Sequence, residues 1–234
     1  MQNTATEKNN ILCDSVDLSL IFGGKESSRF TNFINNKSDD LFSIFNSMIA
    51  PRLSYRTNRI TSTANGTVCF NGCVELKSVK LSKVMKHCES AVCFVATIGG
   101  KIEKEIARLT NENSLFDAYI LDSMGSMAVE KMAEEFWKDM QKKYFTEDKG
   151  ITLRFSPGYC DWPIIEQNKL FHRLLDVRQT DVTLTDSCLM NPRKSISGIF
   201  GIHPFHTGDG PVSPYNPCSD CRKRNCSEKR FSPK

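Results

Sequence analysis

No stretch of this 234-residue sequence stays apolar over the roughly 20 residues that a helix needs to cross a bilayer. The first ten residues, MQNTATEKNN, are polar, and two aspartates interrupt the following ILCDSVDLSLIF. This pattern is unlike the apolar core of a signal peptide. We therefore expect a cytoplasmic protein without a membrane partner.

The sequence also lacks the short motifs of several large enzyme classes. It contains no G-x-S-x-G nucleophile turn, no H-E-x-x-H zinc motif and no glycine-rich phosphate-binding loop, which argues against ordinary hydrolases and kinases. The formal net charge of +4 is small and partly reflects one terminal cluster, CRKRNCSEKR, so no nucleic-acid partner is expected. Charged residues at 25% and hydrophobic residues at 39% are typical of a globular domain.

The ten cysteines are too sparse for a small disulfide scaffold, and Cys69, Cys93 and Cys188 are interpreted as reduced core residues. Near the C-terminus, Cys218, Cys221 and Cys226 form a C-x-x-C-x-x-x-x-C cluster. Thiolates at this spacing can ligate zinc or an iron-sulfur centre. The fourth ligand could be His203, His206 or Cys160. The alternative is a basic tail with reduced thiols.

Hydrophobic periodicity predicts a chain of mixed helices and strands. Helices are expected over 29–49, 82–88, 101–109, 114–145 and 163–176. Strands are expected over 50–60, 66–76, 90–99, 151–159, 182–190 and 195–202, with a turn at Asn65-Gly66 between the first two. We divide the chain into a polar N-terminal segment, 1–28, a main domain, 29–202, and a cysteine-rich basic tail, 203–234.

One short segment, RFSPGYCDWP at 154–163, combines a cation with a rigid turn and aromatic residues. Pro157 fixes φ and Gly158 permits positive φ, so the backbone can approach a ligand closely. Arg154 carries a planar set of donors suited to a carboxylate or phosphate, and Tyr159 and Trp162 offer flat faces. The pattern indicates a site for a small, flat, charged molecule. The structural alternatives are a solvated arginine at a turn and a tyrosine at the edge of the core.

The predicted helix 114–145 carries Asp122, Ser123, Gly125 and Ser126 on its apolar side. In one interpretation the small residues permit close packing on a sheet, and Asp122 is a hydrogen-bonded structural residue. In the other, Asp122 belongs to a ligand pocket.

Two motifs in this order, R-x-x-x-G-Y at Arg154, Gly158 and Tyr159 and M-x-P-x-x-S-x-S-G at Met190 to Gly198, are similar to those of a known family. With CESAVCFVATIGGKIEKEIARL and LDSMGSMAVE upstream, residues 40 to 202 resemble the activation domain of cobalamin-dependent methionine synthase, in a stand-alone form. The resemblance implies an α+β fold with a curved, mainly antiparallel sheet flanked by helices.

The resemblance also implies a ligand, S-adenosylmethionine (AdoMet). The implied AdoMet-binding residues are Arg154, Ser156, Pro157, Gly158 and Tyr159, and a possible pocket adds Asp122, Ser195, Ser197 and Gly198.

The implied function is reductive methylation of cobalamin that has been oxidised to cob(II)alamin. The cobalamin would be held by a methionine synthase core or another corrinoid protein, and a flavodoxin or ferredoxin would supply the electron. A second hypothesis is a non-catalytic module that senses AdoMet or binds a corrinoid protein. A third is a small metal-binding interaction protein that acts through its cysteine tail.

Overall fold

The computed structural model of the chain describes residues 41–71, 73–208, 210–213 and 215–218. The N-terminal segment 1–28 and the last part of the cysteine-rich tail lie outside these residues. Residues 41–48 are helical and pack through Leu41 and Phe45 against α4 (Lys101–Asn111) and α5 (Leu115–Phe145).

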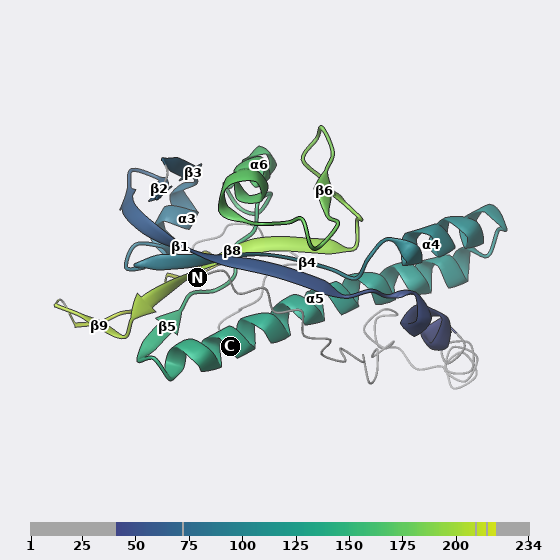
Figure 1. Cartoon of the computed structure of the whole chain (residues 1–234), viewed down its shortest axis with the longest axis horizontal. Coiled ribbons are helices and arrows are strands. Elements are labelled where there is room, and N and C mark those ends of the chain that lie inside the picture. The colour runs from purple at the N-terminus through teal and green to yellow at the C-terminus, as the bar shows by residue number, and fades with distance from the viewer. Residues whose placement is uncertain (1–40, 72, 209, 214, 219–234) are drawn as a thin grey trace.

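A six-stranded sheet in the order β3-β2-β1-β4-β8-β5 forms the centre of the fold (Figure 1). Every neighbouring pair in this sheet is antiparallel. The strands are β1 (Arg52–Ala64), β2 (Thr67–Phe70), β3 (Val74–Lys77), β4 (Ser90–Thr97), β5 (Lys149–Ile151) and β8 (Ser195–Pro204). The α+β fold with a curved antiparallel sheet is therefore confirmed.

Strand β4 is buried on both faces, which explains its almost unbroken apolar sequence. Its side chains alternate between two cores, because successive residues of a strand point to opposite faces of the sheet. Cys93 and Val95 pack with α3 (Val79–Val84) and the helical segment 164–174, whereas Val92 and Phe94 pack with α5.

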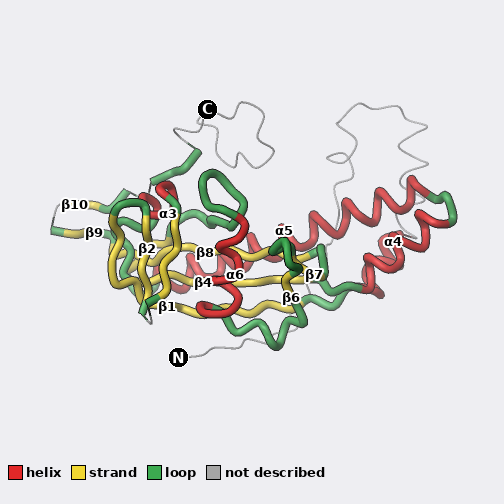
Figure 2. The backbone as a smooth tube through the Cα atoms, turned by 90° about the horizontal axis from the view of Figure 1, so that it is seen from above, coloured by secondary structure: helices red, strands yellow, loops and turns green. Residues whose placement is uncertain are grey.

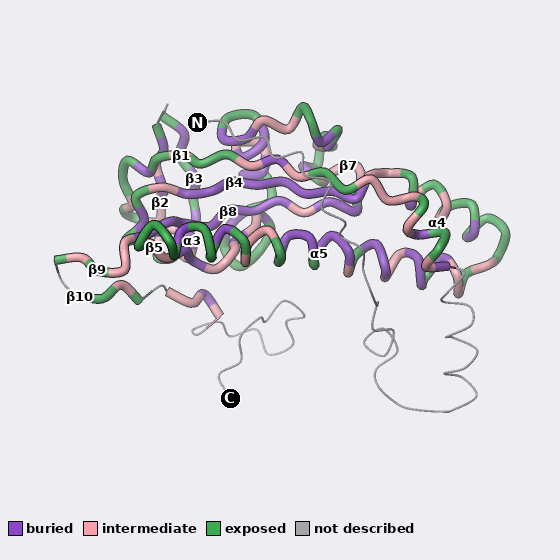
Figure 3. The backbone as a smooth tube through the Cα atoms, turned by 60° about the horizontal axis from the view of Figure 1, so that its bottom comes forward, coloured by how far each residue is buried: buried purple, intermediate pink, exposed green. Residues whose placement is uncertain are grey.

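Helices thus cover both faces of the sheet. The 31-residue α5 runs along one face, and Figure 2 shows the helical segment 164–174 lying across the strands on the other. Figure 3 shows the buried face of α5 turned toward the buried strands β4 and β8. Among the described residues, no helix is both long enough and apolar enough to span a membrane.

Several predicted elements differ from those observed. The helix expected over 82–88 begins earlier, because the Ser78 hydroxyl accepts a hydrogen bond from the Leu81 N–H (2.9 Å) and caps α3. The helix expected over 163–176 is irregular: it consists of a 3₁₀ turn (Ile164–Glu166), one α turn called α6 (Gln167–Lys169) and a π segment (Leu170–Leu174).

The single strand expected over 182–190 is wrong. Only β6 (Thr183–Leu184) and β7 (Met190–Asn191) are extended, and they pair with each other outside the main sheet. The strand expected to end at Ile202 continues to Pro204, because His203 is buried opposite Gly150 of β5. Two further short strands, β9 (His206–Thr207) and β10 (Gly210–Pro211), pair after it.

Candidate functional site

The segment Arg154 to Trp162 lies at the edge of the sheet, directly after β5. Phe155 and Ile199 of β8 exchange two backbone hydrogen bonds of 2.8 Å, which fix this segment to the sheet. The turn then closes on itself through the hydrogen bond from the Gly158 N–H to the Trp162 carbonyl (2.8 Å). Gly158 has a φ of 90°, so the turn needs glycine there, as the sequence predicted.

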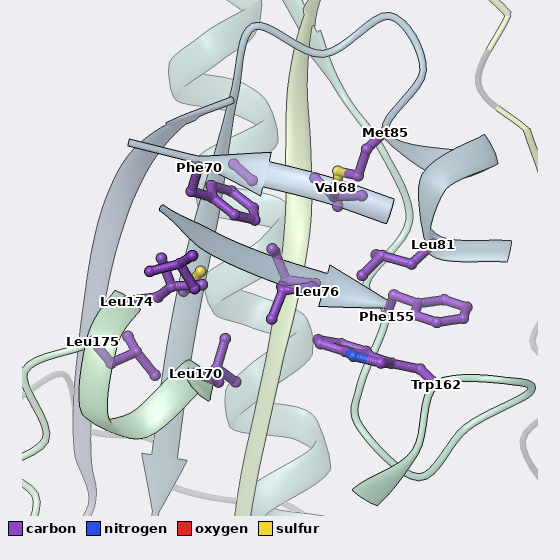
Figure 4. Packing of buried hydrophobic residues seen from close by; sticks show 14 of the residues in the cluster. Val68, Phe70, Leu76, Leu81, Met85, Phe155, Trp162, Leu170, Leu174 and Leu175 are labelled. Atoms are coloured by element: carbon purple, nitrogen blue, oxygen red, sulfur yellow. The ribbon is translucent and has the colours of Figure 1, made fainter. Parts of the chain in front are cut away.

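Trp162 has a structural role that differs from the sequence interpretation. Its indole is buried and stacks on Phe155, with ring centroids 5.9 Å apart and planes inclined by 21°. Figure 4 shows the two rings face to face in the core that also contains Leu76 and Leu81. Trp162 therefore stiffens the turn by packing in the core, while the side chain of Tyr159 remains partly exposed.

Asp161 anchors the far end of the turn to α3, a role that the sequence analysis missed. Its carboxylate accepts hydrogen bonds from the Ser78 hydroxyl (2.6 Å) and from the backbone N–H groups of Val79 (2.7 Å) and Lys80 (3.2 Å). Burial opposes ionisation of Asp161, but these hydrogen bonds prevail and hold the pKa of its carboxyl below the ordinary value of 3.8. The turn is thus fixed at both ends.

Arg154 points away from this core, toward α5. Its guanidinium forms an ion pair with Glu130 of α5, with an N–O distance of 3.3 Å. The Arg154 side chain is only 8% exposed, whereas that of Glu130 is 42% exposed. The arginine is therefore a positioned and partly desolvated cation, not the solvated residue of the structural alternative.

Gly198 is the predicted pocket residue that the structure brings to the turn. A Cβ atom at this position would lie 3.0 Å from the Ser156 hydroxyl oxygen and 3.1 Å from the Phe155 carbonyl oxygen. The segment 154–159 can therefore approach β8 closely only because residue 198 is glycine.

The other predicted pocket residues make structural contacts. Asp122 pairs with Lys194 (2.8 Å), whose aliphatic chain lies 3.2 Å from the Cβ position of Gly125. This agrees with the interpretation of Asp122 as a hydrogen-bonded structural residue. Ser195 donates to the Pro192 carbonyl (2.7 Å), and Ser197 donates to the side-chain oxygen of Gln167 (3.2 Å).

Asp122, Ser126 and Glu130 follow one another at intervals of four residues and therefore lie on one face of α5. The Lys194 ammonium also donates to the Ser126 hydroxyl (2.9 Å). This α5 polar stripe, defined as Asp122, Ser126 and Glu130, thus holds Lys194 at one end and Arg154 at the other.

Two of the hollows on the described surface lie away from the 154–159 turn, whose residues line neither of them. One, of about 290 Å³, lies beside α3 and the end of β8. The other, of about 860 Å³, lies between β1 and the C-terminal end of α5 and includes Tyr55, Arg59 and Tyr144.

The predicted cysteine cluster is only partly described. Cys218 is half-buried, with its backbone N–H bonded to the Asn216 side chain (2.9 Å), and Cys221 and Cys226 lie outside the described residues. Within the described ranges, no three His, Cys, Asp or Glu side chains are grouped closely enough to hold a metal ion. Cys69, Cys93 and Cys188 are free thiols, with Cys93 and Cys188 in the core.

Comparison with known families shows which family this chain belongs to. The sequence profile described as "Vitamin B12 dependent methionine synthase, activation domain" matches residues 81–207, more than half of the chain. The chain belongs to this activation-domain family. The matched region of the activation domain includes α5, the 154–159 turn and β8. No curated protein sequence matches significantly.

A solved structure agrees with the fold of this activation domain. "Crystal Structure of the MetH Reactivation Domain bound to AdoHcy" superimposes with a TM-score of 0.57 at 15% identity. The match covers 86% of this chain and 71% of the other. The shared architecture extends beyond the residues of the family profile to most of the chain.

Asp161 provides a test of how the turn is anchored. Replacing Asp161 with asparagine should lower the free energy of unfolding at neutral pH by about 1 kcal/mol, because the charged acceptor at the start of α3 is lost. The folded pKa is depressed, so the carboxylate stabilises the fold above the unfolded pKa, and this contribution disappears as pH falls through the folded pKa. The stability difference between the wild type and Asp161→Asn should therefore begin to shrink as the pH falls below about 4 and should vanish only below the folded pKa.

Urea unfolding at several pH values measures this difference. Asp186→Asn is the control, since Asp186 is exposed and its carboxylate makes no hydrogen bond among the described residues. An equal effect of the two substitutions, or a difference that persists at low pH, would contradict the assigned anchor.

Proposed function

We propose that this activation domain binds AdoMet at the 154–159 turn and delivers its methyl group to a corrinoid held by a partner protein. The observation that supports this most directly is the position of Arg154. The arginine is partly desolvated at the edge of the sheet, next to a stiff turn with a glycine at positive φ, in a chain of this family.

The ion pair of Arg154 with Glu130 suggests how the amino-acid end of AdoMet binds. That end carries a carboxylate and an ammonium group. The carboxylate can pair with Arg154 while the ammonium pairs with the half-exposed Glu130, so each charge exchanges one partner for another. The aromatic face of Tyr159, partly exposed beside Gly158, can contact the sulfonium or the adenine.

The chemistry needs positioning more than acid–base groups. One electron reduces cob(II)alamin to cob(I)alamin, whose cobalt attacks the AdoMet methyl carbon. The cobalt–carbon bond forms as the sulfur–carbon bond breaks, which yields methylcobalamin and S-adenosylhomocysteine. The corrinoid is the nucleophile, so the protein contributes orientation and proximity and requires no general base.

The proposal also names a partner protein, an electron donor and a cellular compartment. The partner would be a cobalamin-binding methionine synthase core or another corrinoid protein, the electron donor a flavodoxin or ferredoxin, and the compartment the cytoplasm. A non-catalytic AdoMet-sensing module is the second candidate, because it would use the same turn without methyl transfer.

The first test is AdoMet binding by calorimetry. Arg154→Ala should weaken binding at least about tenfold, since a charge-assisted contact worth roughly 1.5 to 3 kcal/mol is lost. Glu130→Gln should weaken binding of AdoMet more than binding of a desamino analogue, which lacks the ammonium group. Lys131→Ala on the same helix is the matched control. Absence of binding to the folded wild type would overturn the proposal.

The second test separates methyl transfer from sensing. Mixed with a cob(II)alamin-loaded methionine synthase core, a low-potential reductant and AdoMet, the protein should accelerate the loss of cob(II)alamin absorbance. Well-aligned intramolecular reactions reach effective molarities of about 10⁵ M or more, so a bound methyl donor beside the corrinoid captures rare cob(I)alamin efficiently. Tyr159→Ala should slow this step. Equal rates with and without the protein, once AdoMet binding is established, would favour the sensing module.

The cysteine cluster is a separate part of the proposal. Cys218, Cys221 and Cys226 would bind zinc or an iron-sulfur centre in the anaerobically purified protein. Elemental analysis and the visible spectrum should show metal in the wild type and its loss in a Cys→Ser variant of all three residues. Equal metal content in both proteins would identify these residues as a reduced, metal-free tail.

A further inference from the structure

The last described segment of the chain lies along α3. Tyr215 packs against the core that includes α3, and the Lys83 ammonium lies over its ring, 5.4 Å from the centroid. Nearer the start of α3, the Lys80 ammonium donates to the carbonyl of the buried Pro217 (3.1 Å). The segment therefore runs from the last turn of α3 toward its first turn, and Cys218 comes next in the chain.

The same end of α3 also holds the turn that contains Cys160. The Asp161 carboxylate accepts a hydrogen bond from the backbone N–H of Lys80 (3.2 Å). Lys80 thus contacts Asp161 through its backbone and Pro217 through its side chain. Cys160 and Cys218 are the chain neighbours of these two residues. The first turn of α3 therefore brings together a cysteine of the turn and the first cysteine of the C-terminal cluster.

The backbone around Cys160 is fixed in a way that suits a metal ligand. Hydrogen bonds from the Gly158 N–H to the Trp162 carbonyl (2.8 Å) and from the Trp162 N–H to the Tyr159 carbonyl (3.0 Å) close the turn around it. Cys160 is exposed at this turn. A thiol on a backbone that is already ordered loses less conformational freedom when it binds a ligand.

The two histidines that the sequence left open as a fourth ligand are less well placed. His203 is only 4% exposed, its Nδ1 lies 2.8 Å from the Pro204 carbonyl oxygen, and a Cβ atom on Gly150 would lie 2.7 Å from its Nε2. Both of its ring nitrogens are thus closed to a metal ion. His206 belongs to β9, which Figure 1 shows projecting beyond the main sheet. Of the three candidates, Cys160 is the one held at the same end of α3 as the tail.

We propose that Cys160, Cys218, Cys221 and Cys226 together bind one metal centre, either a zinc ion or an iron-sulfur cluster. This inference rests on the metal binding proposed above for the tail and adds the fourth ligand. Four thiolates form a closed ligand set for structural zinc and for iron-sulfur clusters. Cys221 and Cys226 lie outside the described residues, three and eight positions after Cys218. The centre would fasten the C-terminal tail to the turn that contains Tyr159.

Metal analysis of the anaerobically purified full chain tests the fourth ligand. Cys160→Ser should weaken metal binding at least about tenfold, measured against a competing chelator, because even loss of an outer-shell partner costs about ten- to a hundredfold in affinity. Cys73→Ser is the matched control. Cys73 is also exposed and has a φ of 61°, close to the 54° of Cys160, but it lies between β2 and β3. Elemental zinc and iron, acid-labile sulfide and the visible spectrum distinguish the two kinds of centre.

A second measurement uses the wild type and does not depend on how a variant folds. Alkylation of the metal-loaded protein by iodoacetamide, followed by mass spectrometry, should find Cys160 protected together with the three tail cysteines. All four should react after the metal is removed, whereas Cys73 should react in both states.

The outcomes separate this inference from the proposals on which it builds. If Cys160→Ser retains metal as well as the wild type does, or if Cys160 reacts equally with and without metal, the assignment of Cys160 is overturned and the three-cysteine site stands. Equal loss of metal in Cys73→Ser would also overturn it. A wild type without metal would overturn both. AdoMet binding to the wild type tests the 154–159 turn independently, since none of these measurements includes AdoMet.

Discussion

The pairing of β8 with the segment 149–155 is the constraint on which the candidate site depends. Side chains alternate between the two faces of a sheet, so this pairing sends Phe155 into the core beneath α3 and Arg154 toward α5. A slip of one residue would place the arginine among Leu76 and Leu81 and turn the phenylalanine toward α5. The hydrogen bonds between Phe155 and Ile199 therefore determine both the packing of the turn and the direction of its cation.

Around this pairing, several contacts make the 154–159 turn stiff. The Phe155–Trp162 stack supports the turn from the core, and Asp161 ties it to the first turn of α3. Gly198 permits the close approach of the turn to β8.

The long helix α5 organises the charges on the same side. Its stripe of Asp122, Ser126 and Glu130 receives Lys194 and Arg154, two cations whose side chains are each 8% exposed. The two pairs differ in a way that matters for function. Lys194 is also bonded to Ser126 and packs its chain on Gly125, which makes it part of the scaffold. Arg154 instead pairs with the half-exposed Glu130 beside the 154–159 turn, at the place where the proposed function has AdoMet bind.

The sequence by itself determined the features that local patterns encode. Four features were predictable: the apolar run of β4, the helical periodicity of α5, the glycine at positive φ in the 154–159 turn and the order of the two motifs. They sufficed for the fold class and the family. These properties depend on neighbours in the chain, through side-chain periodicity and backbone conformation.

Only the tertiary structure decided which groups meet. The ion pair of Arg154 joins residues 24 positions apart, and the Asp161 carboxylate caps a helix 82 positions away at Val79. No local pattern distinguishes Trp162 as a core residue from Tyr159 as an exposed one, or predicts that His203 lies buried opposite Gly150. Strand register and the packing of helices on both faces of the sheet determine these contacts, and both result from burial of the whole apolar surface rather than from any single segment.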